Sequence, residues 1–201
     1  MSRRQDRGAG AWLRWTYRTW EPLRQTQNLI IRGLRPQVVA EITGIQYTLC
    51  QELRRELLPN GPVIRSTIPS GIESRAMRSE QAYRAGSVFV VAYLNAAGAQ
   101  QAARSFQVEA WCAAFDLSQQ VCERLGWTPL PADYAYVIAR EMTNPEELVY
   151  EWCNICGAPF YRNHWIKGRC PFCRELEEKP SPHKTQPSTE NSPRLHAIGP
   201  I

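Results

Sequence analysis

The chain has no apolar stretch long enough to cross a lipid bilayer. Its most apolar run covers residues 88–94, whereas a membrane-spanning helix needs about 20 apolar residues. The first residues contain arginines and tryptophans but lack the continuous apolar segment of a secretion signal. Hydrophobic residues make up 43% of the chain, which is enough to fill a core. We therefore expect a soluble, cytoplasmic protein with no membrane partner.

The sequence also has few of the residues from which catalytic sites are built. It contains three histidines, and two of them, His183 and His196, lie in a C-terminal segment rich in Pro, Ser, Thr, Glu and Lys. The third, His164, offers no plausible catalytic triad. No glycine-rich phosphate-binding loop is present. We therefore expect a protein that is not an enzyme.

Internal repeats and strand-like alternation are missing too, and helical periodicity dominates the middle of the chain. A Pro/Gly-rich connector over residues 59–71 is followed by apolar residues at helical spacing over residues 74–97 and 102–125. Pro131 suits the first turn of a third helix. These patterns predict a mostly α protein with a helical core or assembly region over residues 59–150. The polar composition of residues 177–201 predicts a disordered tail.

Seven cysteines are present, and four of them form two Cys-x-x-Cys pairs, Cys153 with Cys156 and Cys170 with Cys173. An odd number of cysteines in this pattern favours a reducing compartment and a metal over a disulfide framework. The 13 residues between the pairs are enough for a short hairpin. We expect residues 151–176 to form a zinc-ribbon-like module with one structural Zn²⁺ in a closed site. A redox dithiol, or His164 as a ligand, is the alternative.

Positive charge is concentrated near the two ends of the expected fold, although the net charge is only +5. Residues 1–65 carry 11 basic and 5 acidic side chains, a balance of +6, and residues 151–174 carry 4 and 1, a balance of +3. Residues 66–150 carry 6 basic and 9 acidic side chains, a balance of −3. This distribution predicts phosphate contacts in both basic regions. In the second region, the predicted contacts are Arg162, Lys167 and Arg169. Solvated basic surface is the alternative.

Residues 35–55 match the pattern of a DNA-binding helix-turn-helix. Pro36 can open a helix that faces inwards through Val39 and Thr43, Gly44 permits a tight turn, and Ile45, Cys50 and Leu53 continue the buried face. We expect a recognition helix in an arginine-rich segment over residues 1–58. Its predicted DNA contacts are Arg35, Gln46, Tyr47, Thr48, Gln51, Arg54 and Arg55. An ordinary helical hairpin is the alternative.

The sequence resembles the FlhC family, the C subunits of the bacterial flagellar master regulator and related activators of conjugative elements. The resemblance rests on Leu29-Ile-Ile-Arg-Gly-Leu-Arg-Pro-Gln-Val-Val-Ala-Glu-Ile-Thr-Gly44, on Leu53-Arg-Arg-Glu-Leu57 before the Pro/Gly-rich connector, and on the two cysteine pairs, and it covers most of residues 25–175. The tryptophan-rich head and residues 62–72, which lack the expected Pro-Lys-Gly-like element, depart from the flagellar pattern.

The resemblance implies a mostly helical zinc protein that assembles with a small helical partner similar to FlhD. Such a complex binds double-stranded promoter DNA and recruits RNA polymerase. We therefore expect a transcriptional activator subunit that acts in a hetero-oligomer at flagellar or conjugative-transfer promoters. The alternative is a zinc-stabilised protein-interaction or RNA-binding module without sequence-specific DNA recognition.

Overall fold

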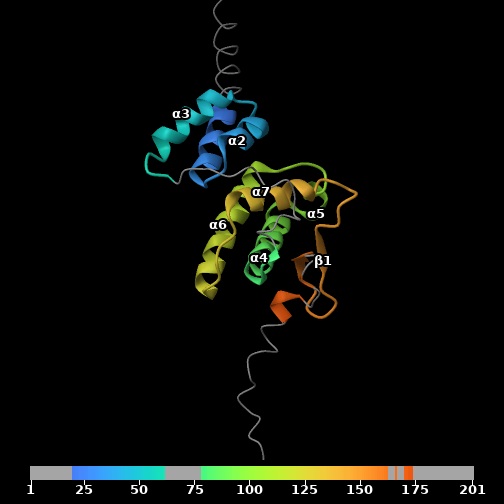
Figure 1. Cartoon of the computed structure of the whole chain (residues 1–201). Coiled ribbons are helices and arrows are strands. Elements are labelled where there is room, and N and C mark those ends of the chain that lie inside the picture. The colour runs from blue at the N-terminus through green and yellow to red at the C-terminus, as the bar shows by residue number, and fades with distance from the viewer. Residues whose placement is uncertain (1–19, 62–77, 163–165, 167–169, 174–201) are drawn as a thin grey trace, which may run out of the picture.

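The computed structural model describes residues 20–61, 78–162, 166 and 170–173 (Figure 1). The described part is mostly helical with a single two-stranded sheet, which confirms the expected mostly α class. Most of the connector, the tail over 177–201, the tryptophan-rich head before Trp20 and the residues His164, Lys167 and Arg169 lie outside the described ranges. None of the described helices is long and apolar enough to cross a membrane.

The helical core consists of α4 (Glu80–Ala97), α5 (Ala99–Ala102), α6 (Val108–Leu125) and α7 (Ala132–Glu141). Helix α4 lies at its centre, because ten of its 18 residues are buried. Its N-terminus is capped by Ser79, whose Oγ accepts a hydrogen bond of 3.1 Å from the backbone N–H of Ala82. The three long helices expected from the periodicity are present.

The expected helix over 102–125 begins later than the periodicity indicates. The chain leaves helical geometry after Ala102 and re-enters it at Val108, so that α5 and α6 are separate elements. Tyr93 fixes the intervening segment, because its hydroxyl accepts a hydrogen bond of 3.1 Å from the backbone N–H of Gln107. Phe106 then packs edge-on against Tyr136 of α7, with ring centroids 5.4 Å apart. Phe106 is therefore a core residue of the connection rather than of the helix.

A helix over residues 20–31 runs along α6 in the same direction. Arg24 contacts Glu109 near the start of α6 at 3.4 Å, and Arg32 contacts Asp116, about two turns further along, at 2.6 Å. The two arginines are eight residues apart and the two acids are seven residues apart. The two ion pairs therefore lie about two turns apart along two parallel helices. The chain then turns at Gly33, whose φ of 89° favours glycine.

Helices α2 (Pro36–Thr43) and α3 (Tyr47–Leu57) follow and pack against each other. Gly44 ends α2 in the left-handed conformation with φ of 70°, as the turn expected at this position requires. Val39 and Cys50 are fully buried, and Ile45 and Leu53 pack against the core. The inward-facing positions expected from the sequence are confirmed at these four residues.

A β-hairpin of β1 (Tyr150–Trp152) and β2 (Pro159–Tyr161) follows α7. The strands are antiparallel, and Tyr150 pairs with Tyr161. Strand β2 packs against α4 at Gly86. Glycine has no Cβ, and a Cβ added at this position would lie only 3.3 Å from the Tyr161 ring. The Tyr161 backbone N–H donates a hydrogen bond of 3.1 Å to Ser87 Oγ of the same helix. Glycine at position 86 therefore allows the hairpin to approach the central helix closely.

Candidate metal centre

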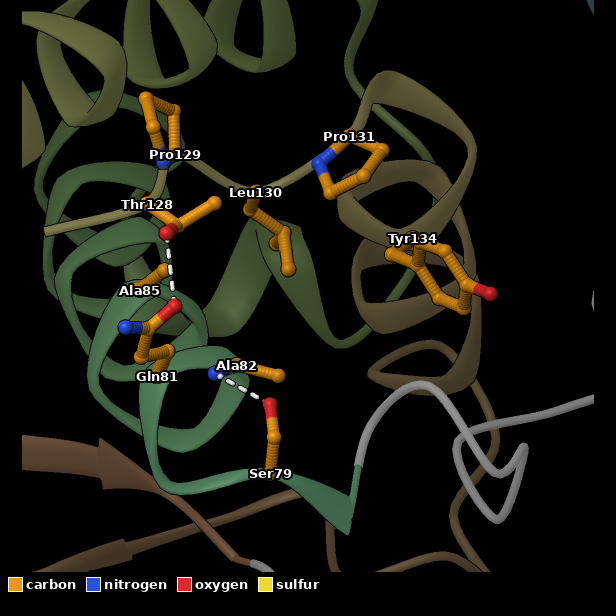
Figure 2. Close-up of a pocket in the computed structure, with 9 residues that line it drawn as sticks. All are labelled: Ser79, Gln81, Ala82, Ala85, Thr128, Pro129, Leu130, Pro131 and Tyr134. Carbon is orange, nitrogen blue, oxygen red and sulfur yellow. Dashed lines mark hydrogen bonds between the residues drawn. The ribbon is translucent and has the colours of Figure 1, made fainter.

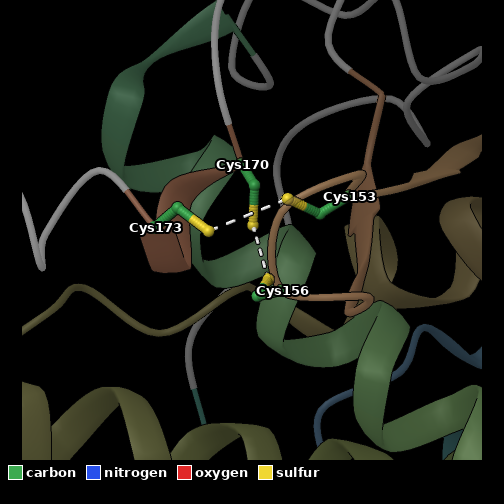
Figure 3. A group of neighbouring side chains, drawn as sticks. All are labelled: Cys153, Cys156, Cys170 and Cys173. Carbon is green, nitrogen blue, oxygen red and sulfur yellow. Dashed lines mark hydrogen bonds between the residues drawn. The ribbon is translucent and has the colours of Figure 1, made fainter.

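The hairpin brings the first cysteine pair into a tight turn. Cys153 directly follows β1, and Gly157, with φ of 71°, turns the chain back towards β2. The Gly157 backbone N–H donates to the Cys153 carbonyl, and the Cys153 N–H donates to the Ala158 carbonyl, both at 2.9 Å. These bonds hold both sulfur atoms on one side of the turn. In the second pair, Cys170 directly precedes the short helical stretch over residues 171–173, and Cys173 is its last residue (Figure 3).

The four cysteine sulfur atoms lie within 4.8 Å of one another. The distance between Cys153 Sγ and Cys173 Sγ is 3.7 Å, and that between Cys156 Sγ and Cys170 Sγ is 3.8 Å. A tetrahedral site with metal–sulfur bonds of about 2.3 Å has sulfur–sulfur edges of about 3.8 Å. These four side chains could therefore hold one metal ion with little movement, as the sequence pattern predicts.

The surroundings of these sulfur atoms shift their pKa values in opposite directions. Backbone hydrogen bonds from Cys156 and Ile155 lower the pKa of Cys153 to about 7. The neighbouring Cys156 sulfur is the main cause that raises the pKa of Cys173, to about 12. Four thiolates at this separation repel one another, so full deprotonation requires a cation between them. Metal binding at this site is therefore expected to release protons.

The cysteines outside this cluster are in the core. Cys50, Cys112 and Cys122 are buried, as expected for isolated cysteines in amphipathic segments. Burial raises the pKa of the Cys112 thiol to about 11. These three side chains therefore remain protonated at neutral pH and serve as small packing residues.

The residues expected to read DNA bases lie at the start of α3. Gln46, Tyr47 and Thr48 are exposed, and Gln51 is half-buried one turn later. The Gln51 side-chain amide donates a hydrogen bond of 2.7 Å to the Tyr47 hydroxyl, so these two side chains form one polar unit. Arg55 is exposed further along the same helix.

Other residues expected to contact phosphates are engaged within the protein. Arg35 forms an ion pair with Asp133 of α7, and its side chain is only 11% exposed. Arg54 is half-buried. Arg162 binds Glu151 across the hairpin at 2.9 Å. Arg35 therefore connects α2 to α7, and its mostly buried side chain is not placed for the expected DNA contact.

The two regions expected to contact nucleic acid lie at opposite ends of the molecule. Helices α2 and α3 occupy one end, and the cysteine hairpin lies at the other, beyond the helical core (Figure 1). Helix α3 and the described part of the cysteine hairpin therefore do not form one continuous surface.

A pocket of about 150 Å³ lies between the start of α4 and the loop before α7 (Figure 2). Its polar groups are partly paired with one another, since Thr128 Oγ1 donates to Gln81 Oε1 at 2.6 Å. Ser79 is occupied as the helix cap. Ala82, Ala85 and the loop Pro129-Leu130-Pro131 line the rest. The described lining is thus mainly apolar and contains no cluster of acidic, histidine or cysteine side chains.

No protein-family model matches the sequence, and no curated protein matches it.

Proposed function

We propose that the protein is a DNA-binding subunit of a transcriptional activator, with α3 as its recognition helix. In this proposal it acts in a hetero-oligomer with a small helical FlhD-like partner. The complex recruits RNA polymerase to flagellar or conjugative-transfer promoters. The observation that carries the proposal is the arrangement of α2 and α3, in which polar side chains are exposed at the start of the second helix.

This arrangement provides what base recognition requires. The first turn of α3 contains no acidic side chain, so its N-terminus does not repel phosphates. The Gln46 side chain does not cap the helix, which leaves its amide available for an adenine edge. The buried Val39 and Cys50 keep the two helices at a fixed angle, as a recognition helix requires.

The charge of this region supports a role for a partner. Residues 36–57 contain three acidic side chains, Glu41, Glu52 and Glu56, and two basic ones, Arg54 and Arg55, so their charge balance is −1. The arginines at 24, 32 and 35 are neutralised by Glu109, Asp116 and Asp133. Phosphate neutralisation supplies much of the affinity for DNA. We therefore infer that α3 supplies base contacts while other parts of the complex supply most of the phosphate contacts.

We further propose that the metal ion is Zn²⁺ and that its role is structural. Four thiolate ligands suit zinc, and a four-coordinate site leaves no position for a reacting water molecule. Cys153, Cys156, Cys170 and Cys173 would hold the ion, and three of the four are buried. The ion would fix the hairpin, which in turn packs against α4 through Tyr161.

The recognition helix can be tested with duplexes selected from a random library by the full zinc-loaded chain at low salt. Gln46→Ala should change the preference at individual base pairs, because one bidentate contact contributes about 1–3 kcal/mol of discrimination. Arg55→Ala should weaken binding to all sequences and lower the salt slope by about one unit. The matched control is Gln120→Ala on the exposed side of α6, which should bind like the wild type.

Two outcomes would contradict this assignment. One is a library from which no sequence is enriched at any salt concentration. The other is an identical preference in the Gln46→Ala and wild-type proteins. Either would favour the alternative of a metal-stabilised protein-interaction or RNA-binding module, for which the internal neutralisation of the three arginines is the supporting observation.

A further inference from the structure

Strand β1 has one edge that no described strand occupies. The sheet contains only β1 and β2 in the described part of the chain. The Arg162 N–H donates to the Val149 carbonyl at 2.8 Å, and the Cys153 N–H donates to the Ala158 carbonyl at 2.9 Å. Hydrogen-bonded and non-bonded pairs alternate in an antiparallel ladder, so the backbone groups of Tyr150 and Trp152 point away from β2. They are therefore directed towards the outer edge of the sheet.

Apolar side chains are exposed along the same segment. Leu148, Trp152 and Ile155 are 54%, 60% and 68% exposed, although all three are large hydrophobic residues. Val149 and Cys153 between them are buried, as expected where successive side chains of a strand point to opposite sides. The Tyr150 ring contacts the Trp152 ring edge-on, with centroids 6.3 Å apart. We call Leu148, Tyr150, Trp152 and Ile155 the hairpin stripe.

The hairpin stripe has an acidic border. Residues 144–157 contain Glu146, Glu147 and Glu151 and no basic side chain. Arg162 offsets Glu151 from the neighbouring strand. Glu146 and Glu147 are exposed beside Leu148. A Zn²⁺ ion bound by four thiolates would add a net charge of about −2 at the other end of the stripe. Among the residues that the structure describes, the charges on this side of the hairpin therefore favour cationic partners over phosphates.

We propose that the outer edge of β1 binds an extended segment of a partner protein whose apolar side chains alternate with Lys or Arg. The segment adds a strand to the sheet through the backbone groups of Tyr150 and Trp152. Its apolar side chains cover the hairpin stripe, and its basic side chains lie near Glu146 and Glu147. A second copy of this chain fits less well, because the same carboxylates would face each other. The inference does not depend on DNA binding by α3.

The probes for this proposal are capped hexapeptides added to the full zinc-loaded chain, with binding followed by ¹H–¹⁵N correlation spectra. Acetyl-(Lys-Val)₃-amide should shift the amide signals of Tyr150 and Trp152. Acetyl-(Glu-Val)₃-amide should bind at least ten-fold more weakly. N-methylation of those alternate residues whose backbone N–H groups would face β1 should weaken binding of the basic peptide to a similar extent. This comparison leaves the protein unchanged, so it does not depend on the folding of a variant.

Protein variants identify the surface. Trp152→Ser should weaken binding of the basic peptide at least ten-fold. The control is Trp20→Ser, because Trp20 has a similar exposure of 61% but lies on a distant helix, and this variant should bind the peptide like the wild type. The inference is wrong if no peptide binds, if the N-methylated or acidic peptide binds equally well, or if both tryptophan variants behave alike. A dimer of the chain that Trp152→Ser dissociates would also overturn it, because a second copy would then be the occupant.

Discussion

Replacing Cys170 by serine is expected to abolish stoichiometric metal binding and to unfold the hairpin. A hydroxyl is a poor ligand for Zn²⁺, and only three thiolates would remain. Tyr161 connects the hairpin to Gly86 and Ser87 of α4, so the loss should extend into the core. At a metal concentration 1,000-fold above the dissociation constant, bound metal stabilises the fold by about 4 kcal/mol. Elemental analysis and urea unfolding would measure both effects.

The matched control for this variant is Cys122→Ala, which removes a fully buried thiol outside the cluster. It should retain one metal ion per chain, and EDTA should still destabilise it. The site would not be a structural metal centre if Cys170→Ser retained its metal. The same conclusion would follow if the wild-type chain, purified under reducing conditions, held no metal and did not respond to EDTA. Disulfides that form reversibly within the cluster would instead support the redox alternative.

Asp133→Ala is expected to destabilise the protein by about 3 kcal/mol, because it leaves the charge of Arg35 poorly compensated in a mostly buried position. The Asp133 side chain is 15% exposed and that of Arg35 is 11% exposed. Asp133 also lies in the first turn of α7, where a negative charge stabilises the helix by roughly 0.3–1 kcal/mol. Urea unfolding at a fixed zinc concentration would measure the loss.

A similar ion pair in a more exposed position is the control. Asp116 binds Arg32 with the same chemistry but is 43% exposed, so Asp116→Ala should lower the free energy of unfolding by about 1 kcal/mol or less. The double variant Arg35→Met with Asp133→Leu should recover most of the stability, because apolar residues can replace a buried ion pair. Equal losses for Asp133→Ala and Asp116→Ala would show that the Arg35 pair does not anchor α2.

Features that depend on neighbouring residues could be predicted from the sequence. The turn at Gly44 and the buried Val39 and Cys50 follow from glycine geometry and helical periodicity. The cysteine cluster follows from the spacing of ligands within each Cys-x-x-Cys pair, and the structure brings both pairs together. In each case the residues that carry the signal lie within a few positions of one another.

Features that depend on distant residues could not be predicted. The arginine-rich segment suggested a phosphate-binding surface, yet Arg24, Arg32 and Arg35 bind acids that lie 85, 84 and 98 residues further along the chain. Charge counting does not show which acid meets which base after folding. The break between α5 and α6 could not be predicted for the same reason. It depends on the Tyr93 hydroxyl of α4, which accepts a hydrogen bond from the backbone N–H of Gln107.

These contacts change the expected mode of DNA binding. The sequence pattern predicts phosphate contacts in both basic regions, but α3 and the described part of the cysteine hairpin lie at opposite ends of the core (Figure 1). The exposed side chains that remain on α3 are mainly polar rather than basic. In the proposed complex, the partner would supply most of the phosphate contacts, and Gln46, Tyr47 and Thr48 would supply the sequence preference.

The most direct test of this account is photocrosslinking from α3 to a selected duplex. Tyr47 is replaced by p-benzoylphenylalanine in the full zinc-loaded chain, and Leu117 of α6, which is 51% exposed against 49% for Tyr47, is replaced in the same way as the control. We predict a crosslink from position 47 to bases within the selected sequence and none from position 117. Equal crosslinking from both positions, or crosslinking from position 117 alone, would contradict the assignment of α3 as the recognition helix.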